Sequence, residues 1–390
     1  MKRVVFLTGT RADFGKMKPL INICETLTEI EPYVYVSGMH LLPQYGSTYR
    51  EVKKENYRNI ALQPNHEFSA QMDINLSRLI ADFSAYVKQI EPDLIVVHGD
   101  RIDALGGAIV AMLNGILLGH IEGGEVTGTV DESIRHAISK MANLHFVSNE
   151  ESLIRLKQLG EDIHHIFVIG SPDIDIMLSN NLPDWECVKK KHAISFDTYA
   201  ILIQHPVVSE VDKLDHDMDE ILSAVCASEK NYIVIYPNND TGSHTILKKY
   251  EALKGNPHFC FYPSLPFEDF LVLLKNAEFI IGNSSCGVRE ACVYGVPAID
   301  VGTRQKNRYS PELLANIQNT AADRSEICTA IEHVEEYRIP SSYFGTGKSA
   351  EKFAEILQQK NVWEVNVQKQ FLDTAETQQK IRIYHNEVCF

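Results

Sequence analysis

The chain lacks the features that define several large classes of protein. No apolar run approaches the roughly 20 residues that a membrane-spanning helix requires, and neither a Gly-x-Gly-x-x-Gly nor a P-loop sequence is present. Positive charge is scarce, because 37 Lys and Arg stand against 52 Asp and Glu, for a formal net charge of −15. We therefore expect no membrane partner and no nucleic-acid partner, since a phosphate backbone requires a basic face. A local cationic pocket for a small phosphate ligand is still compatible with this balance.

Signals for disulfides and zinc are also missing. The eight cysteines are scattered, without a Cys-x-x-Cys pair or a Cys/His cluster at zinc spacing. The start of the chain is basic and then apolar like a signal peptide, but Thr8–Arg11 interrupts the apolar run too early. Reduced thiols are the default in a reducing compartment, so we expect a cytoplasmic protein without a metal. Cys286 has no adjacent base in the sequence and is interpreted as a small packing residue.

Short apolar runs alternate with amphipathic segments along most of the chain. This alternation predicts an α/β protein with parallel sheets covered by helices. A first series of strands is expected at Arg3–Thr8, Tyr33–Ser37, Leu94–His98, Leu117–Ile121, His145–Ser148 and Ile166–Ile169. A second series is expected at Ala200–Gln204, Tyr232–Tyr236, Phe259–Tyr262, Phe279–Ile281 and Ala298–Val301.

A segment at 171–198, richer in Pro, Asp, Asn and Lys, separates the two series. The prediction is therefore two Rossmann-like domains facing a cleft, with the ligand site between them. The boundaries are 1–172 for the first domain and 173–364 for the second. A C-terminal helix at about 365–390 is expected to pack back on the first domain.

Three carboxylates are placed for proton transfer. Asp100 follows the strand at 94–98, Glu122 follows the strand at 117–121, and Asp131 opens a helix after a Gly/Thr-rich loop. The carboxyl ends of neighbouring parallel strands share one sheet edge, where open α/β sheets bind ligands. Acids that converge there favour acid–base chemistry. Helix capping is the alternative for such residues, and Asp131 fits an N-cap equally well.

Two strand-to-helix junctions carry anion-binding signals. In Gly9–Lys16, a glycine turn exposes backbone N–H groups while Arg11 and Lys16 add positive charge. In Gly282–Glu290, Ser284 and Ser285 offer hydroxyl and N–H donors at the start of a helix. The alternatives are a tight turn with solvated basic side chains in the first case and simple N-capping by Ser284 in the second.

Further polar residues follow other strands of the second series. Glu290 is placed to accept sugar hydroxyls, and Arg304 to pair with phosphate or uracil. His205 can contact a diphosphate or move a proton, although a lone histidine is more often structural. The pair Asp173 and Asp175 imitates a metal-binding Asp-x-Asp, but it has no further ligands nearby and is interpreted as a helix start.

Together these motifs resemble the UDP-N-acetylglucosamine 2-epimerases over nearly the whole chain. The resemblance is carried by Gly9–Lys16, His98–Arg101, His120–Glu125, Asp131–His136, Gln204–Pro206, Asn283–Ser285 and Gly302–Gln305. It is strongest to the hydrolysing branch, found in bacterial sialic-acid synthesis and in the animal bifunctional enzyme. The non-hydrolysing branch carries Glu-Ala-Gly-Leu-Arg and Pro-Glu-Glu-x-x-Asn-Arg where this chain has 122–125 and 131–135.

The resemblance implies a glycosyltransferase-B-like homodimer that needs neither metal nor nicotinamide. It also implies conversion of UDP-GlcNAc and water into ManNAc and UDP through a 2-acetamidoglucal. Our predicted catalytic residues are Asp100, Glu122, Asp131 and His205. Our predicted UDP- and sugar-binding residues are Arg11, Asp13, Lys16, Arg101, Asn238, Ser284, Ser285, Glu290 and Arg304.

Three alternative functions remain open at this point. The same chemistry can act on UDP-2,4-diacetamido-2,4,6-trideoxyglucose of legionaminic acid synthesis, since only contacts around C4 and C6 of the sugar would differ. A metal-independent glycosyltransferase of the same fold would need an acceptor site and would not need three such acids. A catalytically inactive UDP-sugar sensor is disfavoured by the intact carboxylates.

Overall fold

The computed structural model describes residues 1–68, 70–126, 130–237, 241–306, 308–310, 312–373 and 377–379. The chain forms two compact units, one made of Met1–Asp175 with Gly345–Phe390 and the other of Ile176–Phe344. The chain therefore enters and leaves the second unit once each, at 175–176 and at 344–345. Within the described ranges, no helix is long and apolar enough to cross a membrane.

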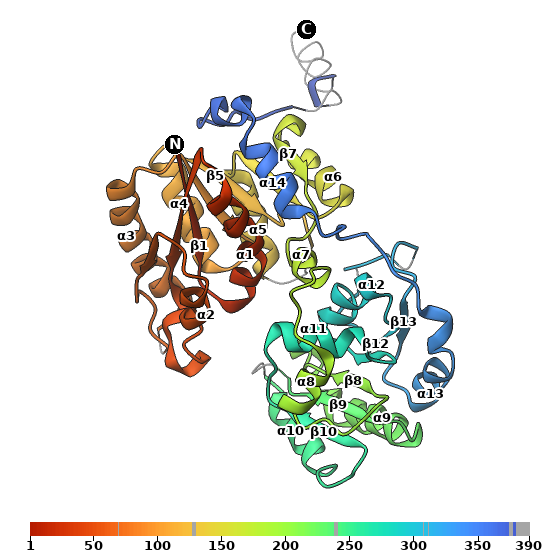
Figure 1. Cartoon of the computed structure of the whole chain (residues 1–390). Helices are drawn as coiled ribbons and strands as arrows, with labels where there is room; N and C mark the ends of the chain where they lie inside the picture. Colours follow the sequence, from red (N-terminus) through yellow and green to blue (C-terminus); the bar gives the residue numbers. More distant parts are fainter. Residues whose placement is uncertain are drawn as a thin grey trace. The chain divides into compact units, whose positions relative to one another are not determined.

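The first unit is built on a seven-stranded parallel sheet in the order β3-β2-β1-β4-β5-β6-β7 (Figure 1). Its strands are β1 (Lys2–Thr8), β2 (Ile30–Val36), β3 (Ile60–Leu62), β4 (Leu94–His98), β5 (Leu117–Ile121), β6 (Leu144–Val147) and β7 (Ile166–Val168). Its helices are α1 (Arg11–Thr26), α2 (Tyr49–Lys54), α3 (Met72–Ile90), α4 (Ile102–Leu113), α5 (Val130–Met141), α6 (Glu150–Gln158) and α14 (Ser349–Leu357). Helix α7 (Asp173–Met177) spans the first passage between the units.

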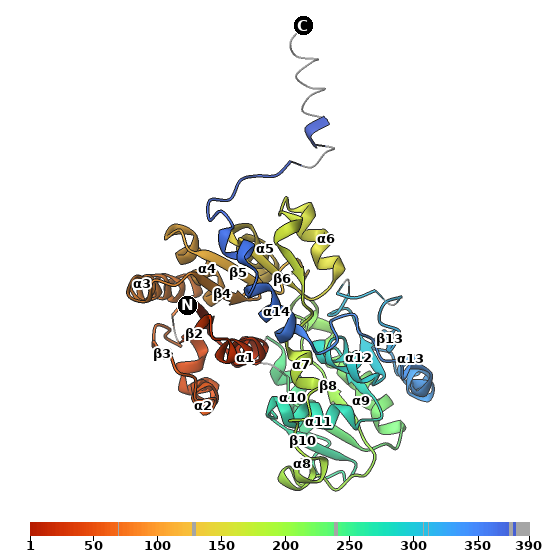
Figure 2. The same ribbon diagram turned by 45° about the horizontal axis from the view of Figure 1, so that its top comes forward.

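Successive side chains of the central strands enter opposite buried layers, as the two-residue repeat of a strand requires. On β1, Val4 and Phe6 enter one layer, whereas Val5 and Leu7 enter the other. Helices α1 and α14 cover the first layer and lie side by side in both ribbon views (Figure 2). Helices α3, α4 and α5 cover the second layer. Both faces of the sheet are thus buried, which explains why its strands read as continuous apolar runs.

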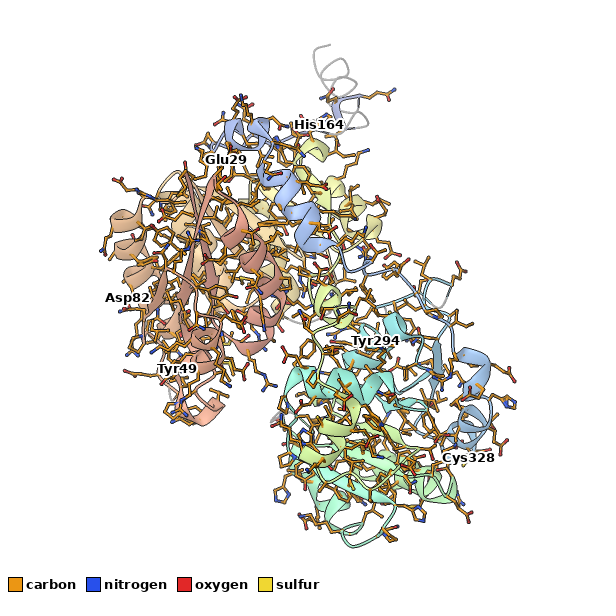
Figure 3. All side chains as sticks on the ribbon, viewed as in Figure 1. Glu29, Tyr49, Asp82, His164, Tyr294 and Cys328 are labelled. Carbon is orange, nitrogen blue, oxygen red and sulfur yellow. The ribbon has the colours of Figure 1, made fainter. Side chains whose placement is uncertain are left out.

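The second unit repeats this plan with six parallel strands in the order β10-β9-β8-β11-β12-β13. Its strands are β8 (Ala200–Ile203), β9 (Tyr232–Ile235), β10 (Phe259–Tyr262), β11 (Ile280–Gly282), β12 (Ala298–Val301) and β13 (Ile317–Thr320). Its helices are α8 (Trp185–Lys191), α9 (Leu214–Ala227), α10 (Ser243–Glu251), α11 (Phe267–Lys275), α12 (Glu290–Tyr294) and α13 (Arg324–Glu332). Apolar residues of α9, α10 and α13 form one core with the sheet. Figure 3 marks Tyr294 at the end of α12, whose hydroxyl donates to the Met177 carbonyl at 2.9 Å.

The structure corrects the predicted course of the C-terminal region. Residues 345–364 belong to the first unit and not to the second, because Phe353, Ile356 and Leu357 of α14 are buried in its core. The expected helix at 365–390 is wrong for residues 365–373, which follow the short 3-10 helix η7 (Lys360–Glu364) without helical structure. The remainder of that prediction lies mostly outside the described residues.

Candidate active site

The strand order of each sheet reverses direction once. Some of the predicted site residues lie just beyond the carboxyl ends of the strands at these two reversals. In the first unit β1 lies between β2 and β4, and in the second β8 lies between β9 and β11. Loops beyond the carboxyl ends of strands at such a reversal leave a crevice that binds ligands in open α/β sheets. The loops in question begin at Gly9 and Gly99 in the first unit and at Gln204 and Asn283 in the second.

Glu122, directly beyond β5, is the centre of a buried ionic cluster. Its Oε1 accepts hydrogen bonds from Lys16 Nζ at 2.7 Å and from the Ser171 hydroxyl. Its Oε2 lies 3.0 Å from His98 Nε2 at the end of β4. Lys16 Nζ also lies 2.9 Å from Asp173 Oδ2, so a single ammonium bridges two carboxylates that are 7% and 5% exposed. This bridge offsets the repulsion that the two anions would otherwise exert on each other.

The backbone of Glu122 adopts a left-handed conformation, with φ of 60°. That conformation is uncommon for a residue with a Cβ and costs roughly 1–2 kcal/mol. Such strain is found where the surrounding structure holds a functional side chain in place. Here the ionic cluster supplies that constraint.

Asp100 and Asp131 form a second acidic group beside the first. The Arg135 guanidinium on α5 donates to Asp100 Oδ2 and, at 3.1 Å, to the Glu125 carbonyl. Burial raises the pKa of Asp100; Arg135 opposes this shift, and the nearby Asp131 carboxylate adds to it. The structure therefore brings these two predicted acids close enough to interact electrostatically.

The predicted loop at Gly9–Lys16 is shorter than expected, because α1 already begins at Arg11. Thr10 is the N-cap, and the Asp13 carboxylate accepts from the backbone N–H groups of Gly9 at 2.9 Å and Thr10 at 2.7 Å in a capping box. Asp13, predicted to bind substrate, thus serves to fix the turn. Lys16, predicted to face an anion of the ligand, is paired with protein carboxylates. Arg11 is exposed.

In the second unit, Asn283 ties together the two loops at the strand reversal. Its side-chain amide accepts from the His205 N–H at 2.7 Å and donates to the His205 carbonyl at 2.8 Å. Its own carbonyl accepts from Arg304 Nη1 at 3.1 Å and from Gln305 Nε2 at 2.8 Å. The predicted residues His205 and Arg304 are therefore held against one buried asparagine.

Ser284 is the N-cap of the 3-10 helix η5 (Ser285–Gly287), as the capping interpretation proposed. Burial and the Glu290 carboxylate raise the pKa of the adjacent Cys286 thiol to about 12, which agrees with a packing residue and not a nucleophile. Arg304 lowers the same pKa, so the charges of Glu290 and Arg304 both reach the Cys286 thiol. Arg101 is exposed at the N-cap of α4, and Asn238 lies outside the described residues.

Sequence reasoning missed several residues of these clusters. His98 and Arg135 lay inside recognised motifs, but nothing in their spacing assigned them partners. Asp173 does start a helix, as predicted, but its ion pair with Lys16 joins segments far apart in the chain. Ser171 and Asn283 are polar residues in junctions, and only the fold shows what they contact.

Comparisons with known proteins agree with this architecture. A family model described as UDP-N-acetylglucosamine 2-epimerase matches residues 22–358. A UDP-N-acetylglucosamine 2-epimerase of Neisseria meningitidis serogroup B is 44% identical over 381 residues, covering 96% of this chain and 99% of the relative. A UDP-N,N'-diacetylbacillosamine 2-epimerase (hydrolyzing) of Legionella pneumophila is 31% identical, covering 92% and 96%.

The fold is matched by solved structures as well. The crystal structure of the Methanocaldococcus jannaschii UDP-GlcNAc 2-epimerase in complex with UDP-GlcNAc and UDP superposes with a TM-score of 0.76 at 24% identity. The match covers 92% of this chain and 99% of that one. Two parallel-sheet α/β units of the glycosyltransferase-B-like type are thus shared across that distance. By sequence and by fold, this chain belongs to the UDP-N-acetylglucosamine 2-epimerase family.

Proposed function

We propose that this protein is a hydrolysing 2-epimerase that converts UDP-GlcNAc and water into ManNAc and UDP. The observation that carries the proposal is the pair of acidic centres beyond the carboxyl ends of the neighbouring strands β4 and β5 in the first unit. One is Asp100 with Asp131 and Arg135, and the other is Glu122 with Lys16. The full-length relatives support the same class of reaction, and one of them is named as hydrolysing.

The chemistry explains why more than one carboxylate is needed. C2 beside an acetamido group is not acidic enough for simple deprotonation, so loss of UDP from C1 must accompany removal of the C2 proton. The product of this elimination is 2-acetamidoglucal. Water then adds at C1, and C2 receives a proton on the face opposite to the one from which its proton was removed. This inverts the configuration at C2 and gives ManNAc. The path requires a base, an acid on the other face, and groups that stabilise the departing diphosphate.

The residues divide between these tasks. Asp100, Glu122 and Asp131 jointly carry out the two proton transfers, with Asp100 paired with Arg135 and Glu122 salt-bridged to Lys16. In the second unit, Arg304, Ser284 and Ser285 hold the diphosphate and uridine while Glu290 accepts ribose hydroxyls. His205 contacts the diphosphate. We expect the active protein to be a cytoplasmic homodimer that works without a cofactor.

Turnover in D₂O with NMR detection of the products tests the proposal. ManNAc should be released with one non-exchangeable deuterium at C2, because C2 loses its proton and regains one from solvent. In H₂¹⁸O, the label should appear initially in ManNAc and not in the phosphate of UDP. UDP-ManNAc as the product would mean the non-hydrolysing reaction, and GlcNAc with protium at C2 would mean direct glycosyl hydrolysis.

The diacetamido sugar is the second candidate substrate, because the Legionella relative carries that activity in its name. The two candidates differ at C4 of the sugar, where an acetamido group replaces the hydroxyl group, and at C6, where a methyl group replaces the hydroxymethyl group. Measuring kcat/KM for both nucleotide sugars under the same conditions decides between them, because the better substrate is the one with the larger kcat/KM.

A further inference from the structure

His120 is completely buried in the middle of the first sheet, yet both nitrogens of its ring are hydrogen-bonded. Nε2 lies 2.8 Å from the Gly99 carbonyl, and Nδ1 lies 3.0 Å from the Ser139 hydroxyl. Gly99 immediately precedes Asp100 and has a φ of 70°. Ser139 lies on α5, one helical turn after Arg135. The imidazole thus joins the loop that carries one predicted acid to the helix that carries its guanidinium partner.

The partners determine the protonation state of the ring. A carbonyl only accepts, so Nε2 carries the hydrogen and donates to Gly99. Burial lowers the pKa of His120 to about 3, and the charges near it are those of His145, Arg135 and His98. The ring is therefore neutral, Nδ1 is an acceptor, and the Ser139 hydroxyl donates to it. Because both ring nitrogens are occupied by Gly99 and Ser139, the imidazole has no free nitrogen with which to transfer a proton to the substrate.

A glycine makes room for this bridge. A Cβ at Gly123 would lie 2.8 Å from Ser139 Oγ and 2.9 Å from His120 Nδ1, distances that would force the two apart. Two connections therefore join the loop at Gly99 to helix α5. One runs through His120 and Ser139, and the other is the hydrogen bond from Arg135 to Asp100. If the first were lost and the loop moved relative to α5, the geometry of the Asp100–Arg135 contact would change.

We propose that His120, together with Ser139, is a positioning residue that sets the geometry of Asp100 against Arg135 and Asp131 by fixing the Gly99 carbonyl to helix α5. It acts through these groups and does not touch the substrate. The inference rests on the proposed function, because it concerns the acids assigned to proton transfer. It predicts that loss of the bridge impairs the chemical step while nucleotide binding by the second unit remains.

Three replacements of His120 separate positioning from packing. Glutamine can place an N–H near the position of Nε2 and so keep the hydrogen bond to the Gly99 carbonyl. Asparagine places its amide near the position of Nδ1 and can keep only the hydrogen bond with Ser139. Phenylalanine can form neither hydrogen bond. We expect His120→Phe and His120→Asn to lower kcat about 10²-fold, as displacement of a reacting group by about 1 Å can do. His120→Gln should retain most of kcat, and UDP affinity in calorimetry should be unchanged in all three.

The pH dependence of kcat distinguishes the two roles, because loss of packing around His120 alone would not change the pKa of Asp100. The charged groups around Asp100 are Arg135, Asp131, His98 and Arg101. If Arg135 is displaced, the opposing effect on the pKa of Asp100 weakens and that pKa rises. The limb of the kcat–pH profile that reports the titration of Asp100 should therefore move to higher pH in Ser139→Ala, whichever limb that is in wild type. The matched control is Ser152→Ala on α6, which removes another fully buried serine hydroxyl, one without a hydrogen-bond partner among the described residues.

Several outcomes would overturn the inference. These are native kcat in His120→Phe, an asparagine variant as active as the glutamine variant, or the same pH profile in Ser139→Ala and Ser152→Ala. If His120→Phe does not fold, the serine pair decides alone. If the wild-type protein turns over neither nucleotide sugar, the proposed function fails. The inference is then decided by ¹³C NMR titration of the Asp100 carboxyl in wild type and Ser139→Ala, assigned with Asp100→Asn, where equal pKa values refute it.

Discussion

Replacing Glu161 with glutamine should destabilise the first unit by about 3 kcal/mol at neutral pH. The Glu161 side chain is 2% exposed and lies 3.0 Å from His145 Nε2 and 3.0 Å from Lys140 Nζ. It also accepts from Lys369, whose ammonium lies 2.6 Å from the Ala142 carbonyl at the end of α5. Glu161 is thus an anion that holds the segment after α14 against the rest of the first unit.

The magnitude follows from the titration of this carboxyl. Burial alone would raise its pKa, but His145 and Lys369 outweigh burial and hold the pKa of Glu161 at about 2, against an ordinary 4.5. At about 1.4 kcal/mol per pH unit, the difference corresponds to about 3 kcal/mol. Burial lowers the pKa of Lys369 despite Glu161, so the amide variant would leave a buried ammonium without its anion.

The sign of the pH dependence is fixed by the same values. A depressed carboxyl pKa stabilises the fold above pH 4.5, and this stabilisation is lost as pH falls from 4.5 towards 2. Urea unfolding of wild type and Glu161→Gln should therefore differ by about 3 kcal/mol at pH 7 and by roughly half of that at pH 3. Amide hydrogen exchange over 360–373 should accelerate in the variant.

A surface pair provides the matched control. Glu151 is 37% exposed and pairs with Arg155 one turn away on α6, so Glu151→Gln should change stability by less than about 1 kcal/mol. Equal destabilisation by the two glutamine variants would refute the assignment of Glu161. A Glu161→Gln effect that is the same at pH 7 and pH 3 would refute it as well.

The remaining predictions concern the three acids, the nucleotide site and a buried histidine. The acids are replaced by their amides in Asp100→Asn, Glu122→Gln and Asp131→Asn. Each variant should lower kcat by at least ~10²-fold and leave UDP binding in calorimetry intact, and near-native turnover would identify that acid as a cap. Arg304→Ala should weaken UDP binding by about 1.5–3 kcal/mol. Unchanged affinity for UDP would contradict the placement of the nucleotide site in the second unit. Burial lowers the pKa of His40 to about 4, so wild type should lose stability between pH 6.5 and 4 as the unfolded state takes up a proton. Urea titrations of His40→Gln should show a smaller loss over that interval, and an identical loss would contradict the assignment.

Much of the fold was predictable because buried parallel strands leave a strong local signal. The strands Leu94–His98 and Leu117–Ile121 have the predicted bounds, since an apolar run bounded by turn residues has few alternatives. The strands at Ile60–Leu62 and Ile317–Thr320 were missed, because both are short edge strands with little alternation. The first turn of α1 was missed because its capping box was taken for an anion-binding loop.

The acids Asp100, Glu122 and Asp131 could be proposed as catalytic from the sequence alone, because each stands where a strand ends or a helix begins and the motifs around them are specific. Only the tertiary structure decided what these acids contact. Lys16 with Asp173, His120 with Ser139, and Glu161 with Lys369 join segments that are distant in the chain. The local preference of a segment for helix or strand depends on its neighbouring residues. These contacts depend instead on how strands and helices pack, and the spacing of residues in the sequence does not specify which distant segments meet.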